Sequence, residues 1–341
     1  MNDPIYETLV LPIEDGTVAL PDDGALFLRA RTGFPSLPTA QVLCEQSFRP
    51  AYDALIRSGF TLRDTNDGRA FGLTLVLPQR QRDENRALLA RAVMSTRDGG
   101  IVMAAQSNTQ GAKTFENELE ALAGNVTSLS KNKCRVFWAR IDQSQVDSDL
   151  LEAWLANDAP HRNDAGYLSR PGLFAWDRID AGSQKLIDHL PADLSGRAAD
   201  LGAGFGYLAD AALKRCPKLT HIDLYEAEQR ALDLARENLA EYGDRAQFLW
   251  ADVTRGVTGD YDVIISNPPF HVDREDRSDI GQAFIRAAAG ALKSGGQLFM
   301  VANRHLPYED TLKAAFKSVK MLADTGGYKI IQAIGPQAKR K

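Results

Sequence analysis

Short apolar runs alternate with amphipathic stretches along the second half of the chain. The amphipathic stretches lie at residues 207–215, 227–242 and 280–292, and the apolar runs lie at residues 198–201, 221–226, 247–251, 261–266 and 297–302. Strands that alternate with helices predict a parallel, doubly wound α/β sheet. Two further runs, at residues 319–323 and 328–334, are joined by the short turn Asp324-Thr325-Gly326-Gly327. Because so short a turn cannot hold a crossover, this last pair of strands must be antiparallel.

A glycine-rich loop follows the first of these strands. Residues 200–206 read Asp-Leu-Gly-Ala-Gly-Phe-Gly, and the glycines let the backbone turn tightly and approach a ligand. The spacing G-x-G-x-G differs from the dinucleotide fingerprint G-x-G-x-x-G, and with Asp200 before it the loop suits S-adenosylmethionine, whose ammonium Asp200 can bind directly or through water. A plain strand–helix turn is the alternative. The candidate cofactor-binding residues here are Asp200, Gly202, Ala203, Gly204 and Gly206.

Two more acidic residues end the strands that follow this loop. Glu226 is placed to accept hydrogen bonds from both ribose hydroxyls of the cofactor, and Asp252 to accept one from the adenine amine. Either carboxylate alone is as well explained as a helix cap. Ligands of open α/β sheets bind at the carboxyl edge of the strands, so three acids at three successive strand ends favour a cofactor site there.

The tetrapeptide Asn267-Pro268-Pro269-Phe270 follows the fourth strand. Two successive prolines fix the backbone, so that the side-chain oxygen of Asn267 and the carbonyl of Pro268 can face one point. Two converging acceptors suit a planar NH2 group, and Phe270 offers a face on which a flat substrate can stack. We expect these four residues to form the catalytic centre, and Asn267 also to touch the cofactor. The chemistry is then mainly positioning and electrostatics, since the proton can leave after methyl transfer.

The first half of the chain repeats part of this pattern. Residues 73–80 parallel residues 263–270, and the following helix, double glycine and strand recur at a constant offset. A polar stretch without apolar periodicity, residues 157–166, predicts a linker. We therefore expect two domains of one fold, residues 1–157 and residues 158–341, although chance similarity of two unrelated α/β halves is the alternative. The first copy has no glycine-rich loop and carries Leu77-Pro78-Gln79-Arg80 in place of the tetrapeptide, which predicts a degenerate, inactive domain.

Composition narrows the class of protein without naming a substrate. No apolar run approaches the ~20 residues needed to span a bilayer, and the N-terminus does not resemble a signal peptide, so we expect a cytoplasmic protein without membrane contact. The three cysteines and five histidines show no metal-ligand spacing, and we expect no metal site. A net charge of −5 is not typical of a nucleic-acid-binding protein. It does not exclude one, because nucleic acid binds to a local basic patch whatever the net charge of the whole chain.

The first domain carries cations that could bind the RNA backbone. They could instead be ordinary solvated surface charges, or the first domain could serve only to stabilise the second. These cations are Arg80, Arg82, Arg86, Arg91, Lys131, Lys133 and Arg135.

From Pro171 to Ile334 the chain resembles the bacterial ribosomal RNA guanine-N2 methyltransferases, in which a methyltransferase small domain follows a degenerate copy of itself. The resemblance lies in Gly172-Leu173-Phe174 and in residues 179–184, 200–206, 264–271, 294–296 and 301–308. It implies two class I methyltransferase (Rossmann-like) domains, the second with a seven-stranded, mostly parallel sheet. It implies S-adenosylmethionine as donor and guanine N2 of ribosomal RNA, free or in an assembled subunit, as acceptor. It also implies that a segment with Asp180, Gly182 and Ser183 closes over the cofactor.

The tetrapeptide specifies an NH2 group on an sp2 carbon rather than one molecule. Methylation of a protein glutamine at N5 is therefore the strongest alternative among enzymes. A non-catalytic binding protein that keeps the cofactor fold is the alternative outside them, but the intact Asp200, Gly202, Gly204, Asn267 and Pro268 argue against it. We expect a monomer, and the sequence does not specify which nucleotide is modified.

Overall fold

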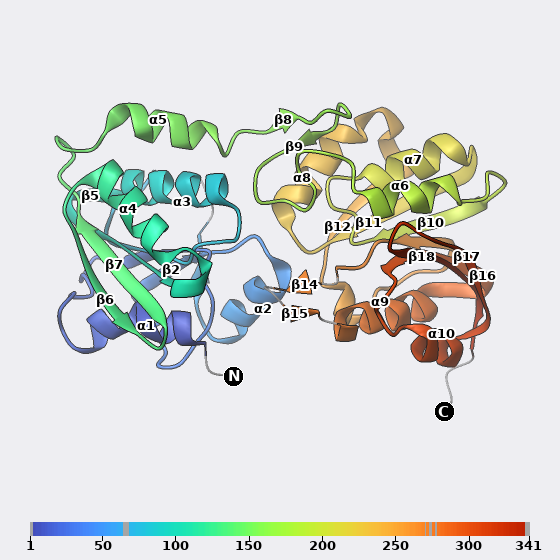
Figure 1. Ribbon diagram of the computed structural model, residues 1–341, viewed down its shortest axis with the longest axis horizontal. Coiled ribbons are helices and arrows are strands. Elements are labelled where there is room, and N and C mark those ends of the chain that lie inside the picture. The colour runs from blue at the N-terminus through green and yellow to red at the C-terminus, as the bar shows by residue number, and fades with distance from the viewer. Residues whose placement is uncertain (1–2, 64–67, 270, 273–274, 277, 338–341) are drawn as a thin grey trace. The chain divides into compact units, whose positions relative to one another are not determined.

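The computed structural model describes residues 3–63, 68–269, 271–272, 275–276 and 278–337 (Figure 1). The chain divides into two compact units. Unit 1 holds Met1–Ala159 together with Arg170–Gly172, and unit 2 holds Pro160–Ser169 together with Leu173–Lys341. The sequence led us to expect two continuous domains, and it did not indicate that Arg170–Gly172 would belong to unit 1.

Unit 2 contains a seven-stranded sheet with the order β12-β11-β10-β13-β16-β18-β17. The neighbours from β12 to β16 pair in parallel, whereas β18 pairs antiparallel with both β16 and β17. This arrangement confirms the predicted parallel sheet closed by an antiparallel hairpin. The strands are β10 (Ser195–Leu201), β11 (Lys218–Glu226), β12 (Ala246–Trp250), β13 (Tyr261–Ser266), β16 (Leu292–Asn303), β17 (Phe316–Thr325) and β18 (Tyr328–Pro336).

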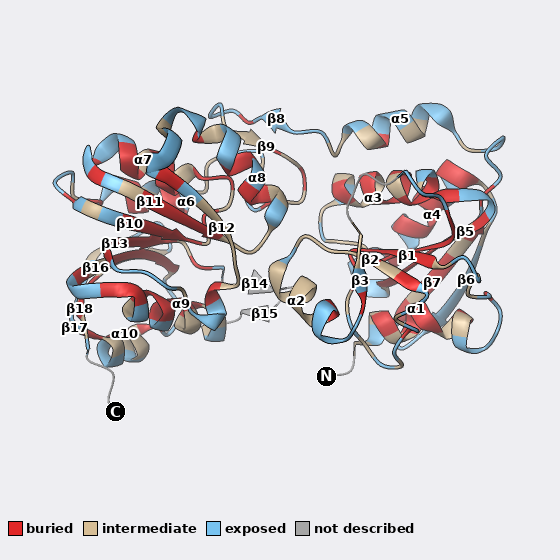
Figure 2. Ribbon diagram, turned by 180° about the vertical axis from the view of Figure 1, so that it is seen from behind, coloured by how far each residue is buried: buried red, intermediate tan, exposed pale blue. Residues whose placement is uncertain are grey.

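Helices cover both faces of this sheet because its central strands are apolar on both sides. One core joins sheet residues such as Ile222 and Ile265 to the helices α6 (Ala181–Asp188), α7 (Tyr207–Arg215) and α8 (Gln229–Asn238). A second core joins sheet residues such as Ile264 to α9 (Ser278–Ala291) and α10 (Glu309–Ala315) on the other face. Successive strand residues point to opposite faces, so Ile264 and Ile265 belong to different cores. Figure 2 shows buried residues concentrated along the strands.

Unit 1 repeats the topology of unit 2. Its sheet has the order β3-β2-β1-β4-β5-β7-β6, again parallel up to an antiparallel hairpin. The strands are β1 (Ala25–Leu28), β2 (Val42–Glu45), β3 (Thr61–Leu62), β4 (Phe71–Val76), β5 (Thr96–Ser107), β6 (Val126–Lys131) and β7 (Cys134–Arg140). The helices are α1 (Pro4–Glu14), α2 (Arg49–Arg57), α3 (Arg82–Met94), α4 (Ala112–Ala123) and α5 (Ser148–Ala156). The chain therefore contains two copies of one fold, as the sequence predicted.

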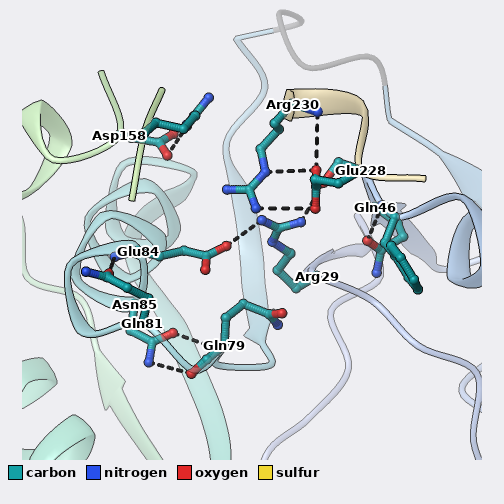
Figure 3. A network of polar contacts seen from close by, with 12 residues as sticks. Arg29, Gln46, Gln79, Gln81, Glu84, Asn85, Asp158, Glu228 and Arg230 are labelled. Carbon is teal, nitrogen blue, oxygen red and sulfur yellow. Dashed lines mark hydrogen bonds and ion pairs between the residues drawn. The ribbon is translucent and has the colours of Figure 1, made fainter. Parts of the chain in front are cut away.

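Unit 1 differs from unit 2 where a glycine-rich loop and helix would follow its first strand. Residues 29–41, between β1 and β2, form no helix. Arg29 follows β1 as Gly202 follows β10, and both have a left-handed backbone, with φ of 55° and 79°. The Arg29 side chain is buried and forms an ion pair with Glu84 at 2.5 Å (Figure 3). It also donates a hydrogen bond to the Ser47 hydroxyl. A buried ion pair therefore occupies the strand ends at which unit 2 has its glycine loop.

In unit 1 the counterpart of the tetrapeptide, residues 77–80, has backbone groups that are already hydrogen-bonded within the unit. The side chain of Asn85 accepts from the Gln79 N–H at 2.6 Å and donates to the Gln79 carbonyl at 2.8 Å (Figure 3). Gly172 also lies against this region, because a Cβ there would meet a carboxylate oxygen of Glu84 at 2.2 Å. The strand ends of unit 1 thus serve its own packing.

Among the described residues, we find no helix whose length and apolar character would let it cross a bilayer.

The ion pair between Arg29 and Glu84 should stabilise unit 1 strongly. Removing one member of a buried pair leaves a charge in a poorly polarisable interior, and we expect Arg29→Met to cost ~3–5 kcal/mol. The double substitution Arg29→Met with Glu84→Leu should cost much less. The measurement is hydrogen–deuterium exchange of peptides from β1 and α3 in the full chain.

A matched control for this substitution is Arg97→Gln, which breaks an ion pair with Asp23 whose side chains are 54% and 44% exposed. An exposed pair contributes less than ~1 kcal/mol. Equal losses of protection in Arg29→Met and Arg97→Gln would contradict the structural role of the buried pair.

Candidate active site

The glycine-rich loop has a backbone that only glycine adopts readily. Gly202, Gly204 and Gly206 have φ of 79°, 56° and 94°, in the left-handed region. At Gly206 a Cβ would also lie 2.5 Å from the side chain of Leu239. The N–H groups of Gly202 and Ala203 donate to the Tyr225 carbonyl at 2.8 and 3.1 Å, which ties the loop to β11. The loop and the N-terminus of α7 are thus held at the carboxyl edge of the sheet.

Asp200 is a buried carboxylate within β10. Its side chain is fully buried, and neither oxygen accepts a hydrogen bond of good geometry from a described residue, although the Ala209 N–H lies close enough to oppose part of the rise in its pKa. Burial, and then the nearby charge of Glu226, raise the pKa of Asp200 to about 8. Because a buried carboxylate is stable only with a donor or a cation, this position suits a ligand that carries an ammonium group.

Glu226 connects the end of β11 to the glycine-rich loop. One carboxylate oxygen accepts from the Gly204 N–H at 2.8 Å and the other accepts from the Glu228 N–H at 2.7 Å. Burial raises the pKa of Glu226, while these two hydrogen bonds oppose that rise. Each oxygen keeps a second lone pair, so the carboxylate can still accept from a ligand hydroxyl. The predicted contact with the ribose stays a prediction.

Asp252 caps a short 3-10 helix. Its carboxylate accepts from the Thr254 N–H at 3.0 Å and from the Thr254 hydroxyl at 2.6 Å. The structure therefore shows the capping role that the sequence left open as an alternative. Contact with the adenine amine stays a prediction, for which the second carboxylate oxygen is the available acceptor.

Asn267 follows β13, and its side chain contacts a segment far away in the sequence. Its amide nitrogen donates to Asp180 at 3.0 Å and to the Ser183 hydroxyl at 2.8 Å. Asp180 is the N-cap of α6 and also accepts from the Ser183 N–H at 2.8 Å. The family resemblance implied that Asp180 and Ser183 lie near the cofactor, but no sequence pattern indicated that they hold the Asn267 side chain.

Asn267 and the glycine-rich loop are neighbours because the strands that precede them, β13 and β10, pair. The hydroxyl of Ser266 donates to the Leu201 carbonyl at 2.7 Å, and a Cβ on Gly202 would lie 3.8 Å from the Asn267 carbonyl. Pro268 is buried and Pro269 is exposed. Phe270 lies outside the described residues, so its predicted stacking role stays a prediction.

Gly182 is required by close packing. A Cβ there would lie 2.9 Å from the Tyr328 ring and 3.0 Å from an Asp180 oxygen. Tyr328 begins β18, directly after the turn Gly326-Gly327, and no sequence pattern indicated its contact with this segment. The Tyr328 ring is thus a part of the site that only the structure reveals.

Metal ligands are not grouped in the part of the chain that the structure describes. It contains no set of three or more His, Cys, Asp or Glu side chains that could hold a metal ion. Cys44, Cys134 and Cys216 are buried free thiols.

Comparison with known proteins agrees with this architecture. The model of the methyltransferase small domain family matches residues 164–332. The ribosomal RNA small subunit methyltransferase C of Serratia proteamaculans is 32% identical over 71% of this chain and 68% of that protein. The protein of the same name from Escherichia coli is 31% identical over 71% of this chain and 69% of that protein. A T. thermophilus 16S rRNA N2 methyltransferase, solved in complex with AdoMet and guanosine, has a similar fold, with a TM-score of 0.81 and 24% identity over 98% of this chain and 92% of that chain.

The duplicated seven-stranded sheets and the glycine-rich strand-end loop define a class I methyltransferase fold. The chain belongs to the ribosomal RNA small subunit methyltransferase C family. The family resemblance predicted from the sequence is thereby confirmed.

The raised pKa of Asp200 predicts a pH dependence of stability. In the folded chain this group keeps its proton up to about pH 8, whereas an unfolded aspartate releases it near pH ~4. The contribution of Asp200 is therefore fully present below pH ~4 and is lost as the pH rises through 8, by up to ~1.4 kcal/mol per pH unit. Asparagine does not ionise, so Asp200→Asn should lack this decline.

Hydrogen–deuterium exchange of peptides from β10 measures this effect in the full chain. We expect the advantage of Asp200→Asn over the wild type to grow from pH 5 to pH 8. An equal pH slope in the two proteins would show that Asp200 is already ionised when buried.

Proposed function

We propose that this protein transfers a methyl group from S-adenosylmethionine to guanine N2 in ribosomal RNA. One observation carries the proposal beyond family membership. At the carboxyl edge of the unit 2 sheet, a fixed amide acceptor on Asn267 lies beside a glycine-rich loop and the buried Asp200 carboxylate, which no described residue neutralises. This arrangement combines a cofactor site with a site that accepts hydrogen bonds from an amine.

Residues on three successive strand ends would hold the cofactor, which supplies an electrophilic methyl group when bound. Asp200 would bind its ammonium, and Glu226 and Asp252 would accept from the ribose and the adenine amine. The loop that carries Gly202, Ala203, Gly204 and Gly206 would lie against the ligand, with open space above the Gly204 backbone, and Asp180, Gly182 and Ser183 would form the adjoining wall. The fit rests on Asp200, because an ammonium ion would stabilise the ionised form of a carboxyl group that burial otherwise keeps protonated.

Asn267 and Pro268 would orient the acceptor nitrogen. The Asn267 side-chain oxygen and the Pro268 carbonyl accept from the two N–H bonds of the substrate amine and hold its lone pair toward the methyl group. Pro269 fixes the turn, and Phe270 would stack on the base. No residue has to remove a proton before transfer, because the nitrogen becomes acidic once it is alkylated. Catalysis here is positioning and electrostatic stabilisation.

We also propose that unit 1 docks the RNA, through a smaller set of cations than the sequence indicated. Arg82 and Arg86 both pair with Glu118, Arg91 pairs with Glu45, and Arg135 pairs with Glu116, which lowers the charge that these side chains offer to a phosphate. Arg80, Lys131 and Lys133 are exposed and form no ion pair with a described residue.

These three cations share one edge of the unit 1 sheet. Arg80 follows the carboxyl end of β4, which is parallel to β5. Lys131 pairs with Cys134, which pairs in turn with Ser107 at the carboxyl end of β5. Three cations at one edge can bind the phosphates of an RNA backbone. A ribosomal substrate is also consistent with the cytoplasmic location expected from the sequence.

Radiolabelled methyl transfer tests the proposed function against its alternatives. Purified protein is incubated with labelled S-adenosylmethionine, ribosomal RNA, ribosomal subunits and a protein extract. We expect label in RNA at N2-methylguanosine. Label in protein would favour glutamine methylation, and no label in either fraction despite cofactor binding would favour a non-catalytic binding protein.

Asn267→Ala should separate catalysis from cofactor binding. The substitution removes an acceptor of the substrate amine, and the loss of one catalytic hydrogen-bonding group costs ~10²–10³-fold in rate. We expect a fall of this size in methyl transfer, measured as initial rate, with cofactor affinity little changed in calorimetry. Turnover near the wild-type rate would show that the tetrapeptide forms only a turn and that Asn267 has no catalytic role.

Neutralising Arg80, Lys131 and Lys133 to glutamine should weaken RNA binding and lower the salt dependence of log Kd by up to ~2–3. A control removes exposed cations that form no ion pair with a described residue from the opposite edge of the same sheet, through Arg57→Gln and Arg140→Gln. Filter binding at several salt concentrations measures both variants. Unchanged RNA affinity with a lowered melting temperature would instead assign unit 1 a stabilising role.

A further inference from the structure

The Asn267 side chain is held in one of its two amide orientations. An asparagine amide can turn by 180° about its last bond, which exchanges the oxygen and the NH2 group. In this site the group that faces Asp180 must be the NH2, because the Asp180 oxygen that it contacts already accepts from the Ser183 N–H and therefore acts as an acceptor. Asp180 and Ser183 receive both N–H bonds of the amide, at 3.0 and 2.8 Å. The amide oxygen therefore points away from them.

This orientation decides what Asn267 can do for a substrate. With the oxygen outward, the side chain accepts a hydrogen bond from an amine. With the amide reversed, it would present N–H groups to the N–H groups of the substrate, and the two donors would repel each other. An acceptor held in advance also needs no reorganisation during the reaction.

We infer that Asp180 and Ser183 are positioning residues that fix the Asn267 amide with its oxygen toward the substrate amine. This inference rests on the proposed function for the identity of the amine, but the amide orientation itself does not depend on the substrate. It assigns the side chains of Asp180 and Ser183 to Asn267 rather than to direct contact with the cofactor.

The segment that provides these two side chains is itself rigid. Asp180 accepts from the Ser183 N–H at the start of α6, so its carboxylate is fixed by the helix that it caps. Ser183 is 7% exposed. The Tyr328 ring covers Gly182 between them, leaving no room for a Cβ. Asp180 and Ser183 therefore act together as a fixed acceptor pair, with the close-packed Gly182 between them.

An exchange of side chains tests this inference most sharply. Asn267→Asp alone places a second carboxylate against Asp180, and we expect kcat to fall ~10²-fold, as for a displaced catalytic group. Adding Asp180→Asn restores the hydrogen bond in the reverse sense. The amide at position 180 then donates to the carboxylate at position 267. In Asp180 the same oxygen, Oδ2, accepts from both Asn267 and the Ser183 N–H, so turning the NH2 toward position 267 weakens the cap of α6, at a cost of ~1 kcal/mol in stability. We expect the double variant to recover at least ~10-fold in kcat over Asn267→Asp alone, because the carboxylate is again held with one oxygen toward the substrate amine.

Two single variants distinguish positioning from other roles. Ser183→Ala should lower kcat ~10-fold without changing cofactor affinity, because one of two anchors of the amide is lost. Asp147→Ala is the matched control for capping, since Asp147 caps α5 in unit 1 by accepting from Leu150 at 2.9 Å, and it should leave kcat unchanged. A double variant no faster than Asn267→Asp, or a Ser183→Ala variant that loses cofactor affinity at unchanged kcat, would overturn the inference.

The orientation can also be observed without any substrate. In protein labelled with ¹⁵N-asparagine, the side-chain signal that disappears in Asn267→Asp belongs to Asn267. We expect its two protons to exchange slowly with water in the wild type and faster in Asp180→Ala. Rapid exchange in the wild type would overturn the inference. Absence of methyl transfer to RNA, with slow exchange retained, would contradict the proposed function alone.

Discussion

Parallel pairing of β10 with β13 is the constraint on which the site depends. In this register Leu201 lies beside Ser266, so the residues that follow the two strands, Gly202 and Asn267, leave the sheet at the same edge. A ligand loop and an acceptor of amine hydrogen bonds therefore meet although they are far apart in the sequence. The hydrogen bond from Ser266 to the Leu201 carbonyl secures this junction. Strand order thus converts two local motifs into one candidate active site.

The same constraint explains what could be predicted from the sequence. The glycine-rich loop, the first three residues of the tetrapeptide and the antiparallel hairpin belong to local patterns, and the structure places them where periodicity and turn length indicate. The contact of Asn267 with Asp180 is not local, because it depends on where α6 packs. The pairing of Arg82 and Arg86 with Glu118 likewise depends on the packing of α3 against α4. Side-chain partners from separate elements are what single-sequence patterns leave undetermined.

The two units show that the fold and the chemistry are separable. Unit 1 keeps the strand order and two buried cores of unit 2, yet residues 29–41 form no helix after its first strand. Arg29 and Glu84 form a buried ion pair at its strand ends, and Asn85 satisfies the backbone of its tetrapeptide counterpart. Hydrophobic cores on both faces of a sheet maintain the architecture without any ligand. The exposed strand-end cations of unit 1 are then available for another use, which we propose is RNA docking.

Mass spectrometry of nucleosides from ribosomal RNA tests the central claim most directly. The comparison uses cells that contain the protein, cells that lack it, and cells that lack it but express the wild-type protein or the Asn267→Ala variant from a plasmid. The account predicts that N2-methylguanosine falls by one modified site per small subunit in the deletion, returns with the wild type and stays low with Asn267→Ala. An unchanged N2-methylguanosine content in the deleted cells would contradict it.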